Sequence, residues 1–409
     1  MSAPPNAGSN TRVGWREIAF ALVVGAIAYA VSCALVWPDP ATKGFGAQFQ
    51  LMSTAPFDLL GQFPHRILVS LLAWVCGLGG PVPGSGEPER FLYFMRGLYV
   101  VLLACVCLYA RWLGARHRDG LLIALAVAVT APVQMYKQHW VGLCDPLAYA
   151  LALVAAMCVR NRRVFWLLFL ANLLTHELAI FLAPWFWFLR RQVDDRWRGD
   201  LVWFAAVVAA YGAFYLLVRS IAQPTYAVDF FLANPLFPWG ALGCWMMALT
   251  HLLLAYGPVL AVLGWHWHSR QYGRERWQLW LVVAGIGMIL AIAFDFMRHA
   301  NLVLLPFVLA SVRFLTAGHR LLYAGLVVAS AGLLLWVPPW SGHAPPTYEL
   351  WGAIDEHVIA ARDFSRVVTH WIPAVWPTLA VIYALLAAVW LLGFAIARWT
   401  RRAGQLPAA

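Results

Sequence analysis

The sequence predicts an all-α, polytopic membrane protein. Of its 409 residues, 62% are hydrophobic and only 11% are charged, whereas soluble proteins contain about 25% charged residues. Apolar segments of roughly 20 residues, the length that crosses a bilayer, recur between short basic stretches. The net charge of +11 is carried by these membrane flanks, so we expect no nucleic-acid partner. The seven cysteines form no C-x-x-C pair, and we expect neither a disulfide framework nor a thiolate metal site.

The first spans are assigned from the basic loops, because Lys and Arg in short loops mark the cytoplasmic side. The basic tail 1–16 precedes the apolar segment 17–37, which has no small-residue cleavage site and is expected to remain as an anchor running outward. The next span, 91–113, ends in ARWLGARHR and therefore returns inward. Residues 38–90 between them form a long outer loop. Its apolar piece 67–80 is too short to cross and is predicted to be a surface helix.

The later segments alternate across the bilayer in the same way. Further spans are expected at 121–138, 145–160, 201–219, 241–265, 277–294, 301–316, 321–337 and 374–397. The last outer loop is 338–373, and the C-terminal tail 398–409 is cytoplasmic, like the N-terminus. The single transmembrane domain 17–397 then holds about eleven or twelve membrane segments. Most of the 29 Lys and Arg residues fall on the cytoplasmic side of this arrangement.

One apolar run, VFWLLFLANLLTHELAIFLAPWFWFLRR, is interrupted in its middle by Thr175, His176 and Glu177. Its two flanks, RNRR and LRRQVDDRWR, are both basic. A single helix would place one flank outside and the ionisable pair near the middle of the membrane, at a high cost in free energy. Two short helices, 164–174 and 177–190, keep both flanks inside. We therefore predict a re-entrant helix pair near 164–190, with its polar apex shielded by protein or facing a wet cavity.

Polar residues gather at the span ends that are predicted to lie outside. Ionisable groups at membrane depth are functional candidates. The candidates for catalysis or for substrate and phosphate binding are Asp39, Asp58, Arg66, Arg96, Lys137, His139, Asp145, His176, Glu177, Asp295, Arg298 and His299. Structural alternatives exist for some of them. Asp145, followed by a proline, fits a helix N-cap, and Asp295 with Arg298 fits an i, i+3 ion pair.

A metal site is an alternative use of part of this set. His139, Asp145, His176, Glu177 and His299 all carry acceptable ligand atoms. The sequence contains no HExxH motif or similar local spacing, since LAIF follows Glu177. No metal ligands and no cofactor are predicted, and a divalent metal held by distant residues stays an open alternative.

Several of these stretches together resemble the bacterial GT-C superfamily of integral-membrane glycosyltransferases. The loop 38–90 is similar to the long outer loop that follows the first span in that superfamily; WPDPATKGFGAQFQLM carries Asp39, and FPHRILVSLLAW looks like its second surface helix. CDPLAYALAL is similar to the outer-loop Asp that opens the fourth span. THELAIFLAPW looks like a segment with a basic-Glu pair and a later proline, matching Glu177 and Pro184. DFMRHANLVLLP is similar to a helix start that faces the lipid phosphate.

This chain departs from the superfamily pattern in two places. Many members carry an Asp-Glu pair soon after the first span, whereas here Asp39 is followed by Pro40. His176 stands where members usually have a more basic residue before the glutamate.

The resemblance implies that a sugar moves, with inversion, from a polyprenyl-phosphate donor to a glycan, lipid or protein acceptor. The reaction would take place on the outer, periplasmic face of a bacterial inner membrane, among membrane lipids. Asp39, or else Asp58, would be the general base. Arg66, Arg96, Lys137 and Arg298 would hold the departing phosphate, because guanidinium and ammonium groups bind it well. Asp145, His176 and Glu177 would hold sugar hydroxyls or orient these cations.

Two other functions fit part of the pattern. A polysaccharide polymerase also joins lipid-linked sugars outside the membrane, but it favours arginine-rich outer loops, and the loop 338–373 has only Arg362 and Arg366. A flippase or transporter of lipid-linked sugar commonly shows internal repeats and broken helices in both halves. Here one broken hairpin is predicted, and no repeat is apparent in the sequence.

Overall fold

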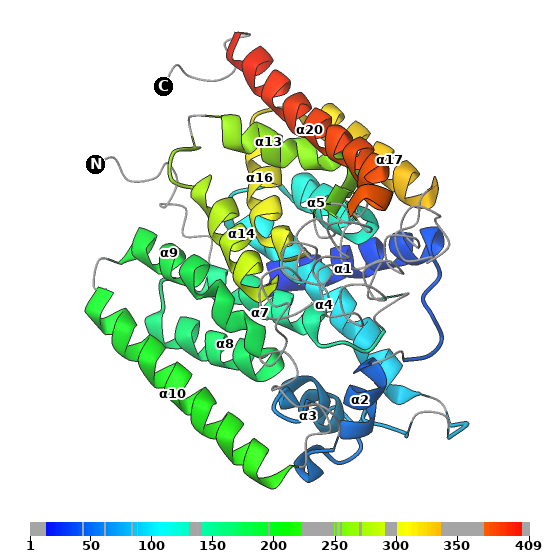
Figure 1. The fold of residues 1–409 in the computed structure, drawn as a ribbon, viewed down its shortest axis with the longest axis vertical. Helices are drawn as coiled ribbons and strands as arrows, with labels where there is room; N and C mark the ends of the chain where they lie inside the picture. The colour runs from blue at the N-terminus through cyan, green and yellow to red at the C-terminus, as the bar shows by residue number, and fades with distance from the viewer. Residues whose placement is uncertain are drawn as a thin grey trace. The chain divides into compact units, whose positions relative to one another are not determined.

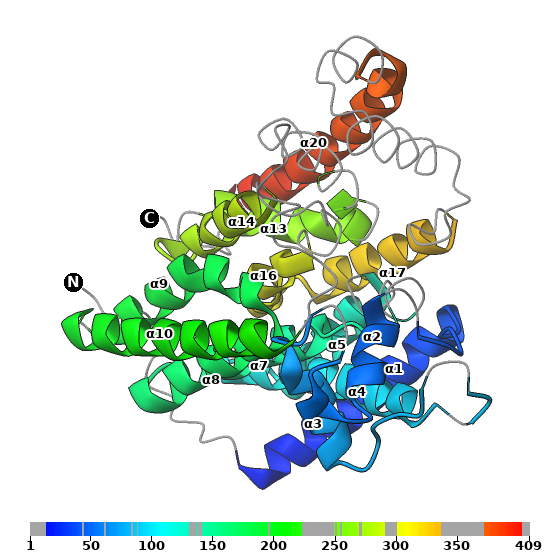
Figure 2. The ribbon, with the colours of Figure 1, turned by 60° about the horizontal axis from the view of Figure 1, so that its bottom comes forward.

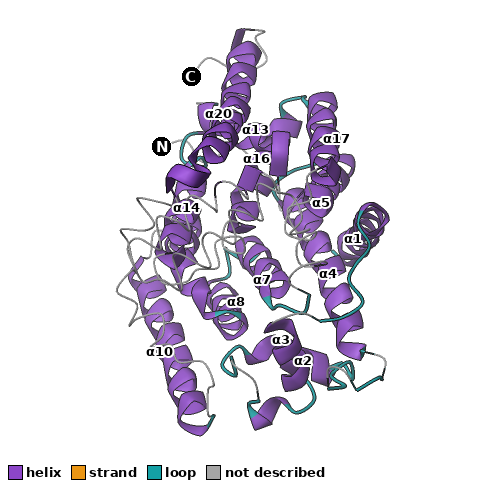
Figure 3. Ribbon diagram, turned by 45° about the vertical axis from the view of Figure 1, so that its right-hand side comes forward, coloured by secondary structure: helices purple, strands orange, loops and turns teal. Residues whose placement is uncertain are grey.

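The computed structural model describes residues 14–42, 45–60, 63–82, 85–87, 89–130, 137, 141–194, 197–222, 249, 252–253, 256–269, 272–290, 301–336 and 372–402. Every regular element in these ranges is a helix (Figure 3). The helices long and apolar enough to cross a membrane are Trp15–Leu35, Arg90–Trp112, Trp197–Ile221 and Leu379–Arg402. These helices confirm the predicted all-α class and indicate a membrane protein. The total number of spans and their sidedness remain predictions.

The chain divides into two compact units. The first comprises Met1–Val129 and Val133–Tyr226, and the second comprises Thr130–Pro132 and Ala227–Ala409. All the candidate site residues that the structure describes belong to the first unit.

Helices α1 (Trp15–Leu35) and α4 (Arg90–Trp112) pack closely and antiparallel in the first unit (Figure 1). A Cβ at Gly25 of α1 would lie 2.5 Å from the carbonyl oxygen of Val100 in α4, so the missing side chain allows the two backbones to meet. At one end of the pair, Glu17 of α1 accepts hydrogen bonds from Arg111 of α4, with Nη2 at 3.2 Å. The first predicted span and the return span therefore form one tight pair.

Helix α4 is the centre of this unit. Its most apolar stretch is 67% buried, whereas the corresponding stretch is 28% buried in α1 and 11% buried in α10 (Trp197–Ile221). Helix α10 leaves large apolar side chains such as Leu216 and Leu217 exposed. An apolar surface of this extent needs a nonaqueous neighbour, which agrees with α1 and α10 facing lipid.

Helices α7 (Asp145–Met157) and α8 (Arg162–Thr175) form an antiparallel hairpin beside α4. The connection is short, and the side chain of Asn161 caps α8 by accepting the Val164 N–H at 3.2 Å. Near the other end, Asn172 Nδ2 donates to the Ala148 carbonyl at 3.2 Å. Because the two helices are almost equal in length, the start of α7 lies next to the end of α8.

The predicted helix break is present. Helix α8 ends at Thr175, whose hydroxyl donates to the Ala171 carbonyl, and His176 is extended with φ −156° and ψ 114°. A 3-10 turn, η2 (Glu177–Leu182), comes next, and α9 (Ala183–Val193) begins with Pro184 in its first turn. The break lies where the sequence predicted it, but the second α-helix begins at Ala183 rather than at 177, because a 3-10 turn comes first. A re-entrant position in a membrane stays a prediction.

Helices α8 and α9 run back along one another, and the start of α8 and the end of α9 are tied to the start of α10 (Figures 1 and 2). Asp200, in the first turn of α10, is fully buried and accepts hydrogen bonds at Oδ1 from Arg162 Nε at 3.0 Å and Arg190 Nε at 3.1 Å. Trp166 Nε1 also donates to it, at 3.0 Å. Asp194 pairs with the same two arginines, at 2.7 Å and 3.1 Å. The two basic flanks of the run therefore meet, as the predicted hairpin requires.

The long loop between α1 and α4 is ordered by three short helices, α2 (Phe45–Met52), η1 (Pro56–Asp58) and α3 (Ile67–Val75). Ser70 of α3 donates to the Phe49 carbonyl of α2 at 2.9 Å, and buried Gln50 donates to the Pro81 carbonyl at 2.9 Å. Helix α3 packs against α8 (Figure 3). The predicted short helix over 67–80 is present over 67–75.

Helix α2 touches the segment just before α7, backbone against backbone, at Gly46. A Cβ on Gly46 would lie 1.9 Å from the Val141 carbonyl oxygen and 2.9 Å from Gly142 Cα. We expect Gly46→Ala to push α2 off this segment and to lower the midpoint of thermal unfolding in detergent. Gly97→Ala is the matched control, because a Cβ there meets nothing within 4 Å. Equal midpoints for the two variants would contradict the close contact.

The second unit is built around α13 (Ala261–His268) and α20 (Ile372–Arg402). A Cβ at Gly393 of α20 would lie 2.3 Å from the Ala261 carbonyl oxygen, and one at Gly264 of α13 would lie 2.8 Å from that of Trp390. Small residues on both helices thus let the backbones approach. The other elements are η3 (Gly257–Leu260), α14 (Trp277–Leu290), η5 (Asn301–Val303), α16 (Leu304–Thr316) and α17 (Arg320–Trp336).

A partly buried ion pair ties the turn before α14 to the end of α16. Arg313 donates to Glu275 from Nε at 2.8 Å and from Nη2 at 2.6 Å. Burial raises the pKa of the Glu275 carboxyl, but the hydrogen bonds and charges of Arg313 and His266 outweigh burial and lower this pKa to about 2. Glu275 is therefore ionised at neutral pH, and the pair acts as a fixed clamp.

Candidate functional site

The best-formed polar cluster lies where the start of α3 meets the break between α8 and η2. Arg66, the N-cap residue of α3, donates to both carboxylate oxygens of Glu177, with Nε 2.6 Å from Oε2. Its guanidinium also lies 4.1 Å from the centre of the Phe63 ring. Arg66 is buried, and the Glu177 side chain keeps 28% of its exposure. The structure thus joins two predicted site residues that are 111 positions apart.

Two histidines surround the same carboxylate. Nε2 of His65 lies 3.3 Å and Nδ1 of His176 lies 3.7 Å from Glu177 Oε2. His65 precedes Arg66 in the chain, and His176 is the extended residue at the helix break. One carboxylate therefore faces a buried guanidinium and two imidazole rings. The Arg66 guanidinium is the fixed positive charge of this cluster, and guanidinium groups bind carboxylate and phosphate oxygens.

Helix α10 supplies two aromatic residues beside this cluster. The Tyr215 ring lies 5.0 Å from the His65 ring in an edge-on arrangement. The Tyr211 hydroxyl is buried and finds no hydrogen-bond partner among the described residues. The sequence analysis selected neither tyrosine as a site residue. Their only signal is a spacing of four positions in an otherwise apolar helix, and tyrosines with this spacing are also common in helix cores.

Asp145 lies at the start of α7, beside the helix break. It is 5% exposed, and one carboxylate oxygen lies within 4.8 Å of both a His176 ring nitrogen and Cys144 Sγ. The N-cap interpretation of Asp145 is wrong: Cys144 is the N-cap residue, and its side chain makes no capping hydrogen bond. Asp145 is instead the first residue of the helix, with Pro146 next. Cys144 is a neighbour that the sequence analysis did not select.

Lys137 and Asp39 are joined at the end of α1. Lys137 Nζ donates to the carbonyls of Ser32 and Val36, each at 2.8 Å, and satisfies acceptors at the C-terminus of α1. The Asp39 N–H donates to the Lys137 carbonyl at 2.9 Å, and its carboxylate accepts the Ala41 N–H at 3.1 Å. The position of Asp39 just past α1 is therefore fixed from both sides.

The remaining predicted site residues fall elsewhere. Asp58 is exposed on η1. Arg96 is half-buried in α4, with its guanidinium 5.7 Å from the Tyr93 ring centre. His139, Asp295, Arg298 and His299 lie outside the described residues, as do most of the predicted loop 220–240 and nearly all of 338–373.

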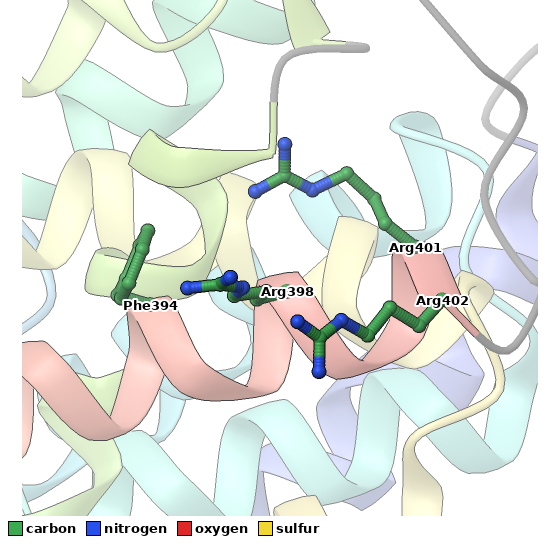
Figure 4. Close-up of a pocket in the computed structure, with 4 residues that line it drawn as sticks. All are labelled: Phe394, Arg398, Arg401 and Arg402. Carbon is green, nitrogen blue, oxygen red and sulfur yellow. The ribbon is translucent and has the colours of Figure 1, made fainter.

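The second unit contains a basic pocket at the end of α20. Arg398, Arg401 and Arg402 line it together with Phe394, and Figure 4 shows the three guanidinium groups extending from the last turns of the helix. Spacings of three and four residues place arginines on one side of a helix. The predicted cytoplasmic flank ARWTRR is thus a cluster suited to anionic lipid headgroups.

The fold and these contacts define a helical protein of membrane type, with an ordered first loop docked on a broken helix. Comparisons with models of known families, with curated proteins and with solved structures find no significant match for this chain.

Proposed function

We propose that this protein is a membrane glycosyltransferase that moves a sugar from a polyprenyl-phosphate donor to an acceptor hydroxyl at the outer face of a bacterial inner membrane. The carrying observation is the pair of Arg66 and Glu177. This pair joins a buried cation of the loop between α1 and α4 to the polar break between α8 and η2, two segments that the proposed reaction requires in one site.

The chemistry requires a base for the acceptor and positive charge for the leaving group. The Asp39 carboxylate takes the proton of the acceptor hydroxyl while the hydroxyl oxygen of the acceptor bonds to the anomeric carbon of the sugar. The bond from that carbon to the phosphate oxygen breaks, and the electron pair leaves with the polyprenyl phosphate. Arg66, oriented by Glu177, stabilises the charge that develops there, and the His65 and His176 rings lie beside the same carboxylate.

Residues near this pair provide a fixed base, a polar group for the donor and an apolar surface for its polyprenyl chain. Asp39 is fixed just past α1 through the Lys137 carbonyl. The buried Tyr211 hydroxyl, which has no hydrogen-bond partner in the described part of the chain, supplies a polar group for a sugar or phosphate oxygen. A polyprenyl chain would lie against the exposed apolar face of α10.

The test uses the purified full chain in nanodiscs with radiolabelled polyprenyl-phosphate hexose. We expect wild-type protein to consume the donor. Asp39→Asn should lower turnover by about 100-fold or more, as loss of a general base does, while donor binding is retained. Asp58→Asn, at an exposed position, tests the alternative base in the same assay. If Asp58→Asn loses turnover and Asp39→Asn does not, Asp58 is the base. A folded wild-type protein that neither binds nor consumes the donor would overturn the proposal and favour transport.

A further inference from the structure

We propose that Cys144, Asp145 and His176 form a binding site for a divalent metal ion of the zinc class. One ligand atom from each residue, the thiol sulfur, a carboxylate oxygen and a ring nitrogen, lies within 4.8 Å of the other two. All three residues are buried, at 0%, 5% and 6% exposure. Metal binding at this point does not depend on glycosyl transfer.

The fold brings the three ligands together through the α7–α8 hairpin. Cys144 and Asp145 begin α7, and the Leu147 N–H donates to the Cys144 carbonyl at 3.1 Å. His176 ends α8, where its N–H donates to the Asn172 carbonyl at 2.8 Å. The same Asn172 reaches across to Ala148 of α7. A single short residue thus aligns the two helix ends from which the ligands project.

The ligand types favour zinc over harder ions. Zinc binds thiolate, imidazole and carboxylate at about 2.0–2.3 Å, so neighbouring ligand atoms in a tetrahedral site are roughly 3.3–3.8 Å apart. A small inward movement of the side chains reaches this spacing. A thiolate and a carboxylate together carry two negative charges, which a Zn²⁺ ion neutralises, and a neutral buried site avoids the cost of buried charge. A thiolate disfavours Mg²⁺ and Ca²⁺, which prefer oxygen ligands.

Glu177 and Arg66 surround His176 and would support it as a metal ligand. Glu177 Oε2 lies 3.7 Å from His176 Nδ1, and Arg66 holds that carboxylate by two hydrogen bonds. A carboxylate beside a ligating histidine fixes the ring and raises its basicity. Three protein ligands leave the fourth tetrahedral position open for an outside oxygen, as in zinc sites that bind substrate or water.

The test is a titration of the full chain in nanodiscs with Co²⁺ under anaerobic conditions, after removal of metal with a chelator. A cobalt–thiolate site gives a charge-transfer band in the near ultraviolet and strong visible bands when tetrahedral. We expect one equivalent of Co²⁺ to produce both, and one equivalent of Zn²⁺ to abolish them. Cys144→Ser should lose the charge-transfer band, and Asp145→Asn and His176→Ala should weaken Co²⁺ binding at least tenfold.

Two cysteine variants serve as controls. Cys158→Ser lies at the other end of α7, and Cys76→Ser removes an exposed thiol; both should keep the full spectrum. A spectrum kept by Cys144→Ser, or lost in either control, would overturn the site, and so would a wild-type chain that gives no band. If Cys144→Ser fails to fold, the wild-type spectrum decides instead: visible Co²⁺ bands without the charge-transfer band would show binding without a thiolate and would overturn the site.

Discussion

Asp200→Asn is expected to lower the free energy of unfolding by about 3–5 kcal/mol, the usual cost of breaking a buried ion pair. Asp200 is fully buried and accepts hydrogen bonds from Arg162, Arg190 and Trp166. An amide removes the negative charge while the buried Arg190 guanidinium stays in place. The ends of α8 and α9 then lose their shared anchor at the start of α10.

The measurement is an SDS titration in mixed micelles, followed by intrinsic tryptophan fluorescence. Arg198→Gln is the matched control, because Arg198 is exposed two positions earlier in α10; we expect it to stay within about 0.5 kcal/mol of wild type. A value for Asp200→Asn as small as that of the control would show that the network does not close the hairpin.

Arg66→Met should lower the free energy of unfolding by about 2–3 kcal/mol, less than a fully buried pair because Glu177 is 28% exposed. Methionine keeps the apolar contact with Phe63 but leaves the Glu177 carboxylate without its bidentate partner. Arg66→Lys should recover only part of the loss, since an ammonium group cannot make the two parallel hydrogen bonds.

A double-mutant cycle separates the ion pair from general packing damage. Glu177→Leu combined with Arg66→Met should cost less than the sum of the two single changes by at least about 1 kcal/mol, because the single variants each leave one charge unpaired. Arg90→Met, at an exposed position at the start of α4, is the control for arginine loss. Additive costs in the cycle would mean that Arg66 and Glu177 stabilise the protein separately.

Parts of the fold are set by local pattern and membrane energetics. The break at Thr175–Glu177 was predictable because a histidine and a carboxylate interrupt an apolar run whose two flanks are both basic. Several helix starts and ends were predicted within a few residues, for example 91–113 against Arg90–Trp112. The expected span 241–265 was not: the 3-10 turn η3 precedes α13, which begins only at Ala261. The features predicted correctly depend on neighbours in the sequence, so the sequence alone contains the signal.

Contacts between residues far apart in the sequence could not be predicted, because the sequence signal is local. Nothing local in FPHRILVSLLAW indicates that Arg66 selects Glu177. The stretch LRRQVDDRWR was interpreted as a basic flank, yet Arg190 and Asp200 neutralise one another inside the protein. Cys144 was not predicted as a site residue, because nothing near it in the sequence shows that His176, a whole hairpin away, lies beside it in the fold. The nearly equal lengths of α7 and α8 were the available signal, since they bring the start of α7 next to the end of α8.

The bond between Arg66 and Glu177 also sets an order of events during synthesis. The ribosome reaches Glu177 only 111 positions after Arg66, roughly 5–20 seconds later at ordinary rates of translation. Until then the N-cap residue of α3 lacks its ion-pair partner. A nascent chain that stalls before the helix break leaves this arginine without its carboxylate. Completion of the first loop therefore depends on synthesis of the α8–α9 hairpin.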